Sequence, residues 1–154
     1  YSAGCGHHCK GCHNPQSWDI NYATMVQVED VANRLLATDE DITFSGGDPM
    51  FQIEAFAELA SIIKAKSNKN IWCYTGYTFE QLLRNNKSLE LLKNIDVLVD
   101  GRFIEEQKDK EILFRGSRNQ RLIDVQQSLK LGEIVTYQPI GLLSPLLMKY
   151  KIHA

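Results

Sequence analysis

Short apolar runs alternate with amphipathic segments along much of this chain. Ile42–Phe44, residues 70–75 and residues 95–99 are rich in β-branched and aromatic residues, and each predicts a strand. Apolar residues recur at helical spacing between Val28 and Leu36 and again between Ile53 and Ile63. Strands that alternate with helices of this length predict parallel strands joined by right-handed crossovers. The chain is therefore expected to have an α/β fold.

The length and composition of the chain fit one compact domain. It has 154 residues, of which 44% are hydrophobic and 23% are charged, so collagen, a disordered tail and a long coiled coil are excluded. No internal repeat or low-complexity linker divides the sequence. Residues 1–154 are therefore predicted to form a single domain.

Charge and hydropathy narrow the classes of partner. The formal net charge is −2, so no general positive field attracts nucleic acid or an anionic membrane. The apolar stretch at residues 140–148 is far shorter than the ~20 residues that span a bilayer. Closely spaced thiols also suit a reducing compartment. We therefore expect a cytoplasmic protein that binds neither nucleic acid nor a membrane.

The loops that follow the predicted strands carry unusual residues. Ser45-Gly-Gly-Asp-Pro49 follows the first strand, Tyr74-Thr-Gly-Tyr77 the second and Asp100-Gly-Arg-Phe103 the third. A further loop, residues 5–12, precedes the first helix, and the alternation predicts a strand before it, of which only residues 1–4 belong to this chain. The carboxyl ends of parallel strands meet at one edge of a sheet, so all these loops are expected on one rim.

The second half of the chain gives weaker signals. Thr78-Phe-Glu-Gln81 is a capping-box pattern that opens a third helix. Farther on, residues 112–114 predict a short strand and residues 133–137 an edge strand that ends before Pro139. Between these strands, residues 115–121 form a basic polar loop, which fits equally a solvated face and a surface that binds a partner's carboxylate.

Three of the four cysteines crowd into one short stretch. Cys5, Cys9 and Cys12 have the spacing C-x3-C-x2-C, whereas Cys73 stands alone in a predicted strand and is expected to be a small core residue. Thiolates held this close suit three corners of an iron-sulfur cube and leave the fourth iron open. A zinc site is the alternative reading, because His7, His8 or His13 would supply a fourth ligand.

Ser45-Gly-Gly-Asp-Pro49 is the second chemical signal. Its two glycines would let a ligand lie against bare backbone, and Asp48 carries a carboxylate suited to an ammonium group. Taken alone, the motif favours an ordinary tight turn between a strand and a helix. Its expected position on the same rim as the cysteines favours a binding role.

Together these motifs resemble the radical S-adenosylmethionine superfamily, and within it the activating proteins of anaerobic (class III) ribonucleoside-triphosphate reductase. The resemblance covers the chain from Cys5 to about Leu129. Besides the cysteines and the glycine turn, the matching segments are Cys12-His-Asn-Pro15, Ser17-Trp18, Trp72 with Tyr74-Thr-Gly-Tyr77, Asp96-Val-Leu-Val-Asp-Gly-Arg-Phe103 and Phe114-Arg-Gly-Ser-Arg-Asn-Gln120.

The resemblance implies a partial parallel (β/α) barrel of the radical S-adenosylmethionine type and a set of cofactor contacts. Cys5, Cys9 and Cys12 would hold a [4Fe-4S] cluster. Gly11, Cys12 and His13 would border S-adenosyl-L-methionine, and Gly46, Gly47 and Asp48 would receive its amino acid end. Many members of the superfamily carry an aromatic residue directly before the third cysteine, where this chain has Gly11.

The resemblance also implies a reaction and its partners. An electron from a flavodoxin-like reductant would enter the cluster and cleave S-adenosylmethionine, and the resulting 5′-deoxyadenosyl radical would take a hydrogen atom from a glycine of the anaerobic ribonucleoside-triphosphate reductase. The cofactors carry this chemistry, so no catalytic side chain is predicted. Two alternatives stay open: a zinc-stabilised binding module without catalysis, and an activating enzyme for a different glycyl-radical protein.

Overall fold

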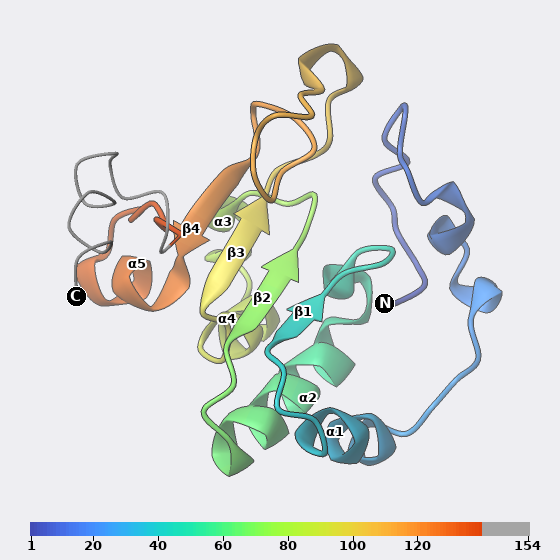
Figure 1. Cartoon of the computed structure of the whole chain (residues 1–154), viewed down its shortest axis with the longest axis vertical. Coiled ribbons are helices and arrows are strands. Elements are labelled where there is room, and N and C mark those ends of the chain that lie inside the picture. The colour runs from blue at the N-terminus through green and yellow to red at the C-terminus, as the bar shows by residue number, and fades with distance from the viewer. Residues whose placement is uncertain (140–154) are drawn as a thin grey trace, which may run out of the picture.

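The computed structural model describes residues 1–139, so the apolar stretch at 140–148 lies outside the described residues. A four-stranded sheet runs in the order β1 (Ile42–Phe44), β2 (Ile71–Tyr74), β3 (Val97–Asp100) and β4 (Arg121–Asp124), as Figure 1 shows. The first three strands are parallel, and β4 pairs antiparallel with β3. The prediction of an α/β fold is confirmed, and the prediction of parallel strands holds for β1 to β3.

The helices follow the strands in the predicted alternation. They are α1 (Val28–Leu36), α2 (Ile53–Lys66), α3 (Phe79–Leu82), α4 (Asn86–Leu92) and α5 (Val125–Leu131). Short 3₁₀ helices lie in the loops: η1 (Pro15–Trp18), η2 (Ile20–Tyr22), η3 (Pro49–Gln52) and η4 (Glu105–Gln107). The predicted capping box at Thr78 is present and opens α3. Among residues 1–139, no helix has the length and apolar character needed to cross a bilayer.

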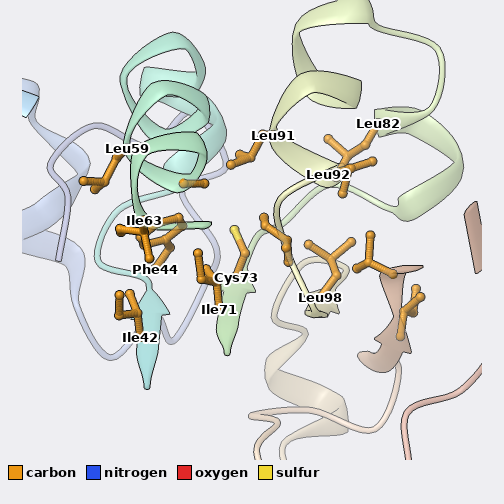
Figure 2. Packing of buried hydrophobic residues seen from close by; sticks show 14 of the residues in the cluster. Ile42, Phe44, Leu59, Ile63, Ile71, Cys73, Leu82, Leu91, Leu92 and Leu98 are labelled. Atoms are coloured by element: carbon orange, nitrogen blue, oxygen red, sulfur yellow. The ribbon is translucent and has the colours of Figure 1, made fainter. Parts of the chain in front are cut away.

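The hydrophobic core lies between the sheet and helices α1, α2 and α4 (Figures 1 and 2). Alternate strand residues point into it, so Ile71 and Cys73 of β2 are buried while Trp72 and Tyr74 on the other face are half-buried. The buried strand residues pack with Leu59 and Ile63 of α2 and with Leu91 and Leu92 of α4. This packing leaves the carboxyl ends of the parallel strands free to carry loops.

Two predicted strands of the second half differ in the structure. Residues 112–114 form a turn, in which Phe114 has a left-handed φ of 62° and its ring centroid lies 5.1 Å from that of Trp72. Residues 133–137 contribute a single antiparallel bridge, between Thr136 and Ile123, so the predicted edge strand is mostly absent. The chain instead forms β4 and α5 from residues that sequence patterns did not single out, because β4 is short and has charged residues at both ends.

Residues 1–4 run beside the turn that follows β1. Ser2 forms a parallel bridge with Gly46, the Ser2 N–H donates to the Ser45 carbonyl at 2.8 Å, and the Asp48 N–H donates to the Gly4 carbonyl at 2.8 Å. This pairing brings Cys5 directly to the end of β1.

Candidate functional site

The loops that follow the parallel strands meet at one rim, as predicted. His7 of the cysteine loop (residues 5–12) has its Nε2 atom 2.9 Å from Oδ2 of Asp48, which follows β1. The Gly76 N–H after β2 donates to the same oxygen at 2.9 Å. The Gly101 N–H after β3 donates to the Tyr77 carbonyl at 3.1 Å. The cysteine loop therefore lies across the ends of β1 and β2.

Backbone contacts fix both ends of the cysteine loop. The Cys5 N–H donates to the carbonyl of Trp18 at 3.1 Å, and the Cys12 N–H donates to the carbonyl of Cys9 at 3.1 Å. Gly11 has a left-handed φ of 73°, and a Cβ there would meet the side chain of Glu105. A residue with a side chain is therefore disfavoured at Gly11, next to the third cysteine.

The three cysteines of this loop are free and half-buried. Burial raises the pKa of the Cys5 thiol, and Asp48 and Cys9 act in the same direction, while the backbone N–H groups of His7 and His8 oppose them. The Asn14 N–H donates to the Cys12 sulfur at 3.4 Å. Such N–H donors stabilise thiolates and tune iron-sulfur clusters.

The side chains of the loop do not surround a single ion. Among residues 1–139, no group of three or more His, Cys, Asp or Glu residues converges on a position that could hold a metal ion. Two of the histidines considered as a fourth zinc ligand point to different neighbours. His7 faces Asp48, whereas the His8 ring centroid lies 4.8 Å from that of Trp18.

Cys73 belongs to the core rather than to the site. Its side chain is fully buried in the cluster between β2 and the helices, and burial raises the pKa of its thiol well above the usual value. The prediction that Cys73 is a small core residue is confirmed.

The Asp48 carboxylate is buried and already bound by protein groups. Its Oδ1 accepts the Met50 N–H at 2.9 Å and so caps η3, while its Oδ2 accepts the Thr75 hydroxyl at 3.0 Å and the Gly76 N–H at 2.9 Å. Asp48 thus joins the turn after β1 to the turn after β2.

The two glycines of the turn after β1 are needed for packing within the chain. A Cβ at Gly46 would meet the backbone of Ser2, and a Cβ at Gly47 would meet the Gly4 carbonyl. The bare backbone that was expected to contact a ligand therefore also contacts residues 1–4. The Asn14 side-chain amide donates to the Gly46 carbonyl at 3.2 Å, so this turn is directly connected to the segment that follows Cys12.

His13 is exposed in the segment that follows the third cysteine. Together with Asn14 and Ser17 it lines a hollow of about 360 Å³, which also borders Ser2 and Tyr22. The structure thus brings Cys12, His13 and Gly46 into one neighbourhood through Asn14.

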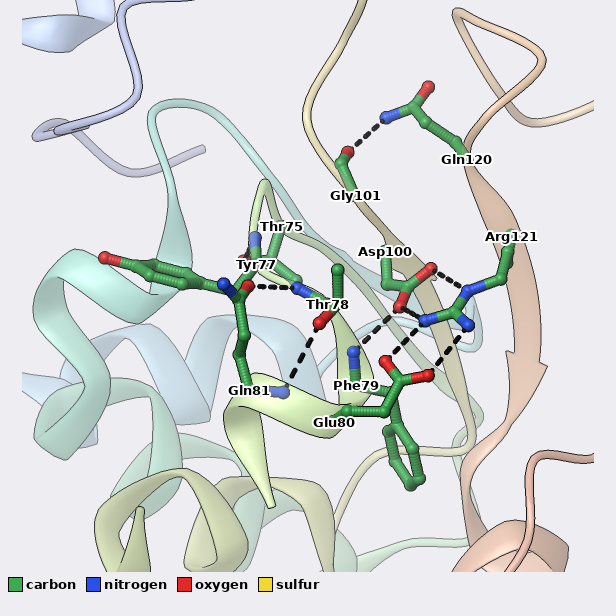
Figure 3. A network of polar contacts seen from close by, with 10 residues as sticks. All are labelled: Thr75, Tyr77, Thr78, Phe79, Glu80, Gln81, Asp100, Gly101, Gln120 and Arg121. Carbon is green, nitrogen blue, oxygen red and sulfur yellow. Dashed lines mark hydrogen bonds and ion pairs between the residues drawn. The ribbon is translucent and has the colours of Figure 1, made fainter. Parts of the chain in front are cut away.

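A charged network that sequence reasoning missed lies at the end of β3 (Figure 3). Arg121 of β4 donates to both oxygens of the buried Asp100, at 2.9 and 2.5 Å, and to both oxygens of Glu80, at 3.0 and 2.8 Å. Asp100 also accepts the Phe79 N–H at 2.8 Å. The hydrogen bonds from Arg121 lower the pKa of Glu80 to about 2. The network holds the start of α3 against β3 and β4. No local sequence motif predicts it, because its members are distant in sequence.

Comparisons with known proteins point to one family. A family profile described as "4Fe-4S single cluster domain" matches residues 1–123. A relative from Haemophilus influenzae is 35% identical over 131 residues, which are 78% of this chain and 82% of the relative. A relative from Enterobacteria phage T4 is 38% identical over 129 residues, 79% of this chain and 80% of the relative. One from Escherichia coli K12 is 34% identical over 129 residues, 78% of this chain and 82% of the relative.

All three relatives are named anaerobic ribonucleoside-triphosphate reductase-activating protein. No solved structure matches the chain. The matched profile includes every residue predicted from the sequence to hold a metal or a cofactor, from Cys5 to Asp48.

Proposed function

The chain belongs to the family of anaerobic ribonucleoside-triphosphate reductase-activating proteins, and we propose that it activates such a reductase by reductive cleavage of S-adenosylmethionine, which generates a glycyl radical on the reductase. One observation carries the proposal. Three free, half-buried thiols lie on one loop at the strand ends, beside a Gly-Gly turn, within a stretch that matches a 4Fe-4S single cluster domain.

Cys5, Cys9 and Cys12 are the proposed ligands of a [4Fe-4S] cluster. The donor set fits this group because thiolates are the usual ligands of such clusters and because backbone N–H groups lie at the sulfurs of Cys5 and Cys12. When bound, a cluster with three cysteine ligands supplies an open iron and an electron for the reductive cleavage. The cysteine loop would bind and orient the cluster, and it would limit access of water to the rim.

Cofactor binding is proposed for residues on both sides of Asn14. Gly11, Cys12 and His13 border S-adenosyl-L-methionine, and Gly46, Gly47 and Asp48 receive its amino acid end. The hydrogen bond from Asn14 to Gly46 supports this pairing of segments. Because the Asp48 carboxylate is bound by Met50, Thr75 and Gly76, we assign the contribution of Asp48 to its main chain.

The fold, partners and compartment complete the proposal. The parallel strands β1 to β3 with their helices support a partial (β/α) barrel of the radical S-adenosylmethionine type, with residues 1–154 as one activating domain. The protein substrate is the anaerobic ribonucleoside-triphosphate reductase, and the electron donor is a flavodoxin-like reductant. Free thiols suit the reducing cytoplasm.

Anaerobic reconstitution tests the metal part of the proposal. Incubation with iron and sulfide should give about four irons per chain and a broad brown absorbance that bleaches with dithionite. Stoichiometric zinc without such a band would contradict the proposal and favour a zinc-stabilised binding module.

A further inference from the structure

His7 and His8 are adjacent in the cysteine loop but have opposite environments. The side chain of His7 is only 12% exposed and faces Asp48. His8 is exposed, and its ring lies against Trp18. The loop thus turns one histidine toward the strand ends and the other toward solvent.

The ring of His7 packs against the turns after β1 and β2. Its Nε2 atom lies 2.9 Å from the Asp48 carboxylate, although the two groups are not aligned as a hydrogen bond. Its ring centroid lies 4.6 Å from that of Tyr77 in an edge-to-face arrangement. A Cβ at Gly76 would collide with the His7 ring. Gly76 therefore leaves the space that His7 occupies.

The loop that follows β3 contacts the backbone of His7. The guanidinium of Arg102, which follows β3, donates to the His7 carbonyl. Lys10 of the same loop is paired with Glu105 at 3.0 Å, although both side chains are exposed and this pair contributes little. Residues from the ends of three parallel strands therefore converge on one residue between Cys5 and Cys9.

We propose that His7 is a positioning residue that anchors the cysteine loop to the strand ends and so places Cys5 and Cys9 for cluster binding. The cluster part of this inference rests on the proposed function; the anchoring of the loop does not. In this arrangement the Asp48 carboxylate positions His7 and the turn after β2. A loop held by a few side-chain contacts opens locally more often once one of these contacts is removed.

Limited trypsin digestion of the cluster-free full chain tests the anchoring directly, since Lys10 lies in the loop. Replacing His7 with alanine should speed cleavage after Lys10 by about tenfold, which corresponds to about 1.4 kcal/mol. His7→Gln should restore most of the protection, because the glutamine amide reaches toward Asp48 as Nε2 does. His8→Asn is the matched control and should leave cleavage unchanged, since asparagine tolerates the left-handed φ of 48° at this position.

A second variant keeps the test valid if His7→Ala fails to fold. Arg102 is exposed, so Arg102→Gln should leave the fold intact and should also speed cleavage after Lys10. Cleavage in all variants is compared well below the unfolding temperature, with sites in α2 as the reference for global unfolding.

Iron content after anaerobic reconstitution provides the second measurement. The His7→Ala protein should retain less than about half of the iron of the parent, and His8→Asn should match the parent. Unchanged cleavage in both His7→Ala and Arg102→Gln, or equal iron in the parent and His7→Ala, overturns the inference. If the parent itself binds no cluster, the proposed function fails, while the digestion result still decides whether His7 anchors the loop.

Discussion

The helix-covered face of the sheet and the strand-end rim are held together by different forces. On the helix side, apolar side chains such as Leu98 and Ile63 are buried in one cluster. At the rim, buried polar groups such as Asp48 and Asp100 bind partners from other loops. Apolar burial is non-directional, whereas each polar contact at the rim needs a specific partner. The core therefore supplies most of the stability, and the contacts at the rim position the cysteine loop.

The two cysteine environments should show the sharpest contrast. Cys9→Ala removes a proposed ligand and should abolish the cluster while leaving the fold intact. Cys73→Ala should keep the full iron content and cost only about 1 kcal/mol in the free energy of unfolding, because a small buried group is lost. Iron analysis and denaturant unfolding of both variants provide the check. Equal iron contents would remove the distinction between the two regions.

A core truncation should affect stability without affecting the site. Leu98 is fully buried in β3, so Leu98→Ala should lower the free energy of unfolding by about 2–5 kcal/mol through lost burial and a cavity. Iron binding at a temperature where the variant is folded should match the parent. A variant with normal stability would show that Leu98 is not packed as described.

Removing the Arg121 cation should have an intermediate effect. Arg121→Leu leaves the buried Asp100 carboxylate with only the Phe79 N–H among its present partners. The free energy of unfolding should fall by about 1–3 kcal/mol, since a buried charged group loses its hydrogen bonds. Asp100→Asn in the Arg121→Leu background should recover part of the loss. A second loss of the same size would mean that the two side chains act independently.

The smallest effect is a pH dependence at Glu80. Its pKa of about 2 in the folded chain lies below the usual glutamate value of 4.5, so its stabilising effect is complete above about pH 4.5 and is lost as the pH falls toward 2. The side chain is half-exposed, which limits the effect to below about 1 kcal/mol. Glu80→Gln should therefore lower unfolding free energy above pH 4.5 and converge with the parent near pH 2. A constant difference across this range would show that Arg121 does not set the Glu80 pKa.

The helix side of the fold was predictable because its information is local. The spacing of Val31, Ala32 and Leu35 gives α1, and Ile42 and Phe44 give β1. The meeting of the loops at one rim was also predictable, because the carboxyl ends of parallel strands lie at the same edge of a sheet. The strand predicted at 112–114 was wrong. These apolar residues lie in a turn, and the ring of Phe114 packs against that of Trp72.

The contacts within the rim could not be read from the sequence. Arg121 binds Asp100 and Glu80, which are 21 and 41 residues away, and His7 faces Asp48 and Gly76 from a different loop. No sequence pattern pairs these residues with one another. The cysteines and the Gly-Gly turn were found because their spacing is itself the signal, whereas His7 looked like one of three equivalent candidate ligands.

The central claim is that this chain generates a glycyl radical on its partner. The reconstituted protein, incubated anaerobically with the anaerobic ribonucleoside-triphosphate reductase, S-adenosylmethionine and a reductant, is measured by electron paramagnetic resonance. We predict a glycyl doublet on the reductase, accompanied by 5′-deoxyadenosine, and no doublet with the Cys9→Ala variant. Formation of 5′-deoxyadenosine without a doublet would contradict the assigned partner, and the absence of both products with a fully loaded cluster would contradict the proposed reaction.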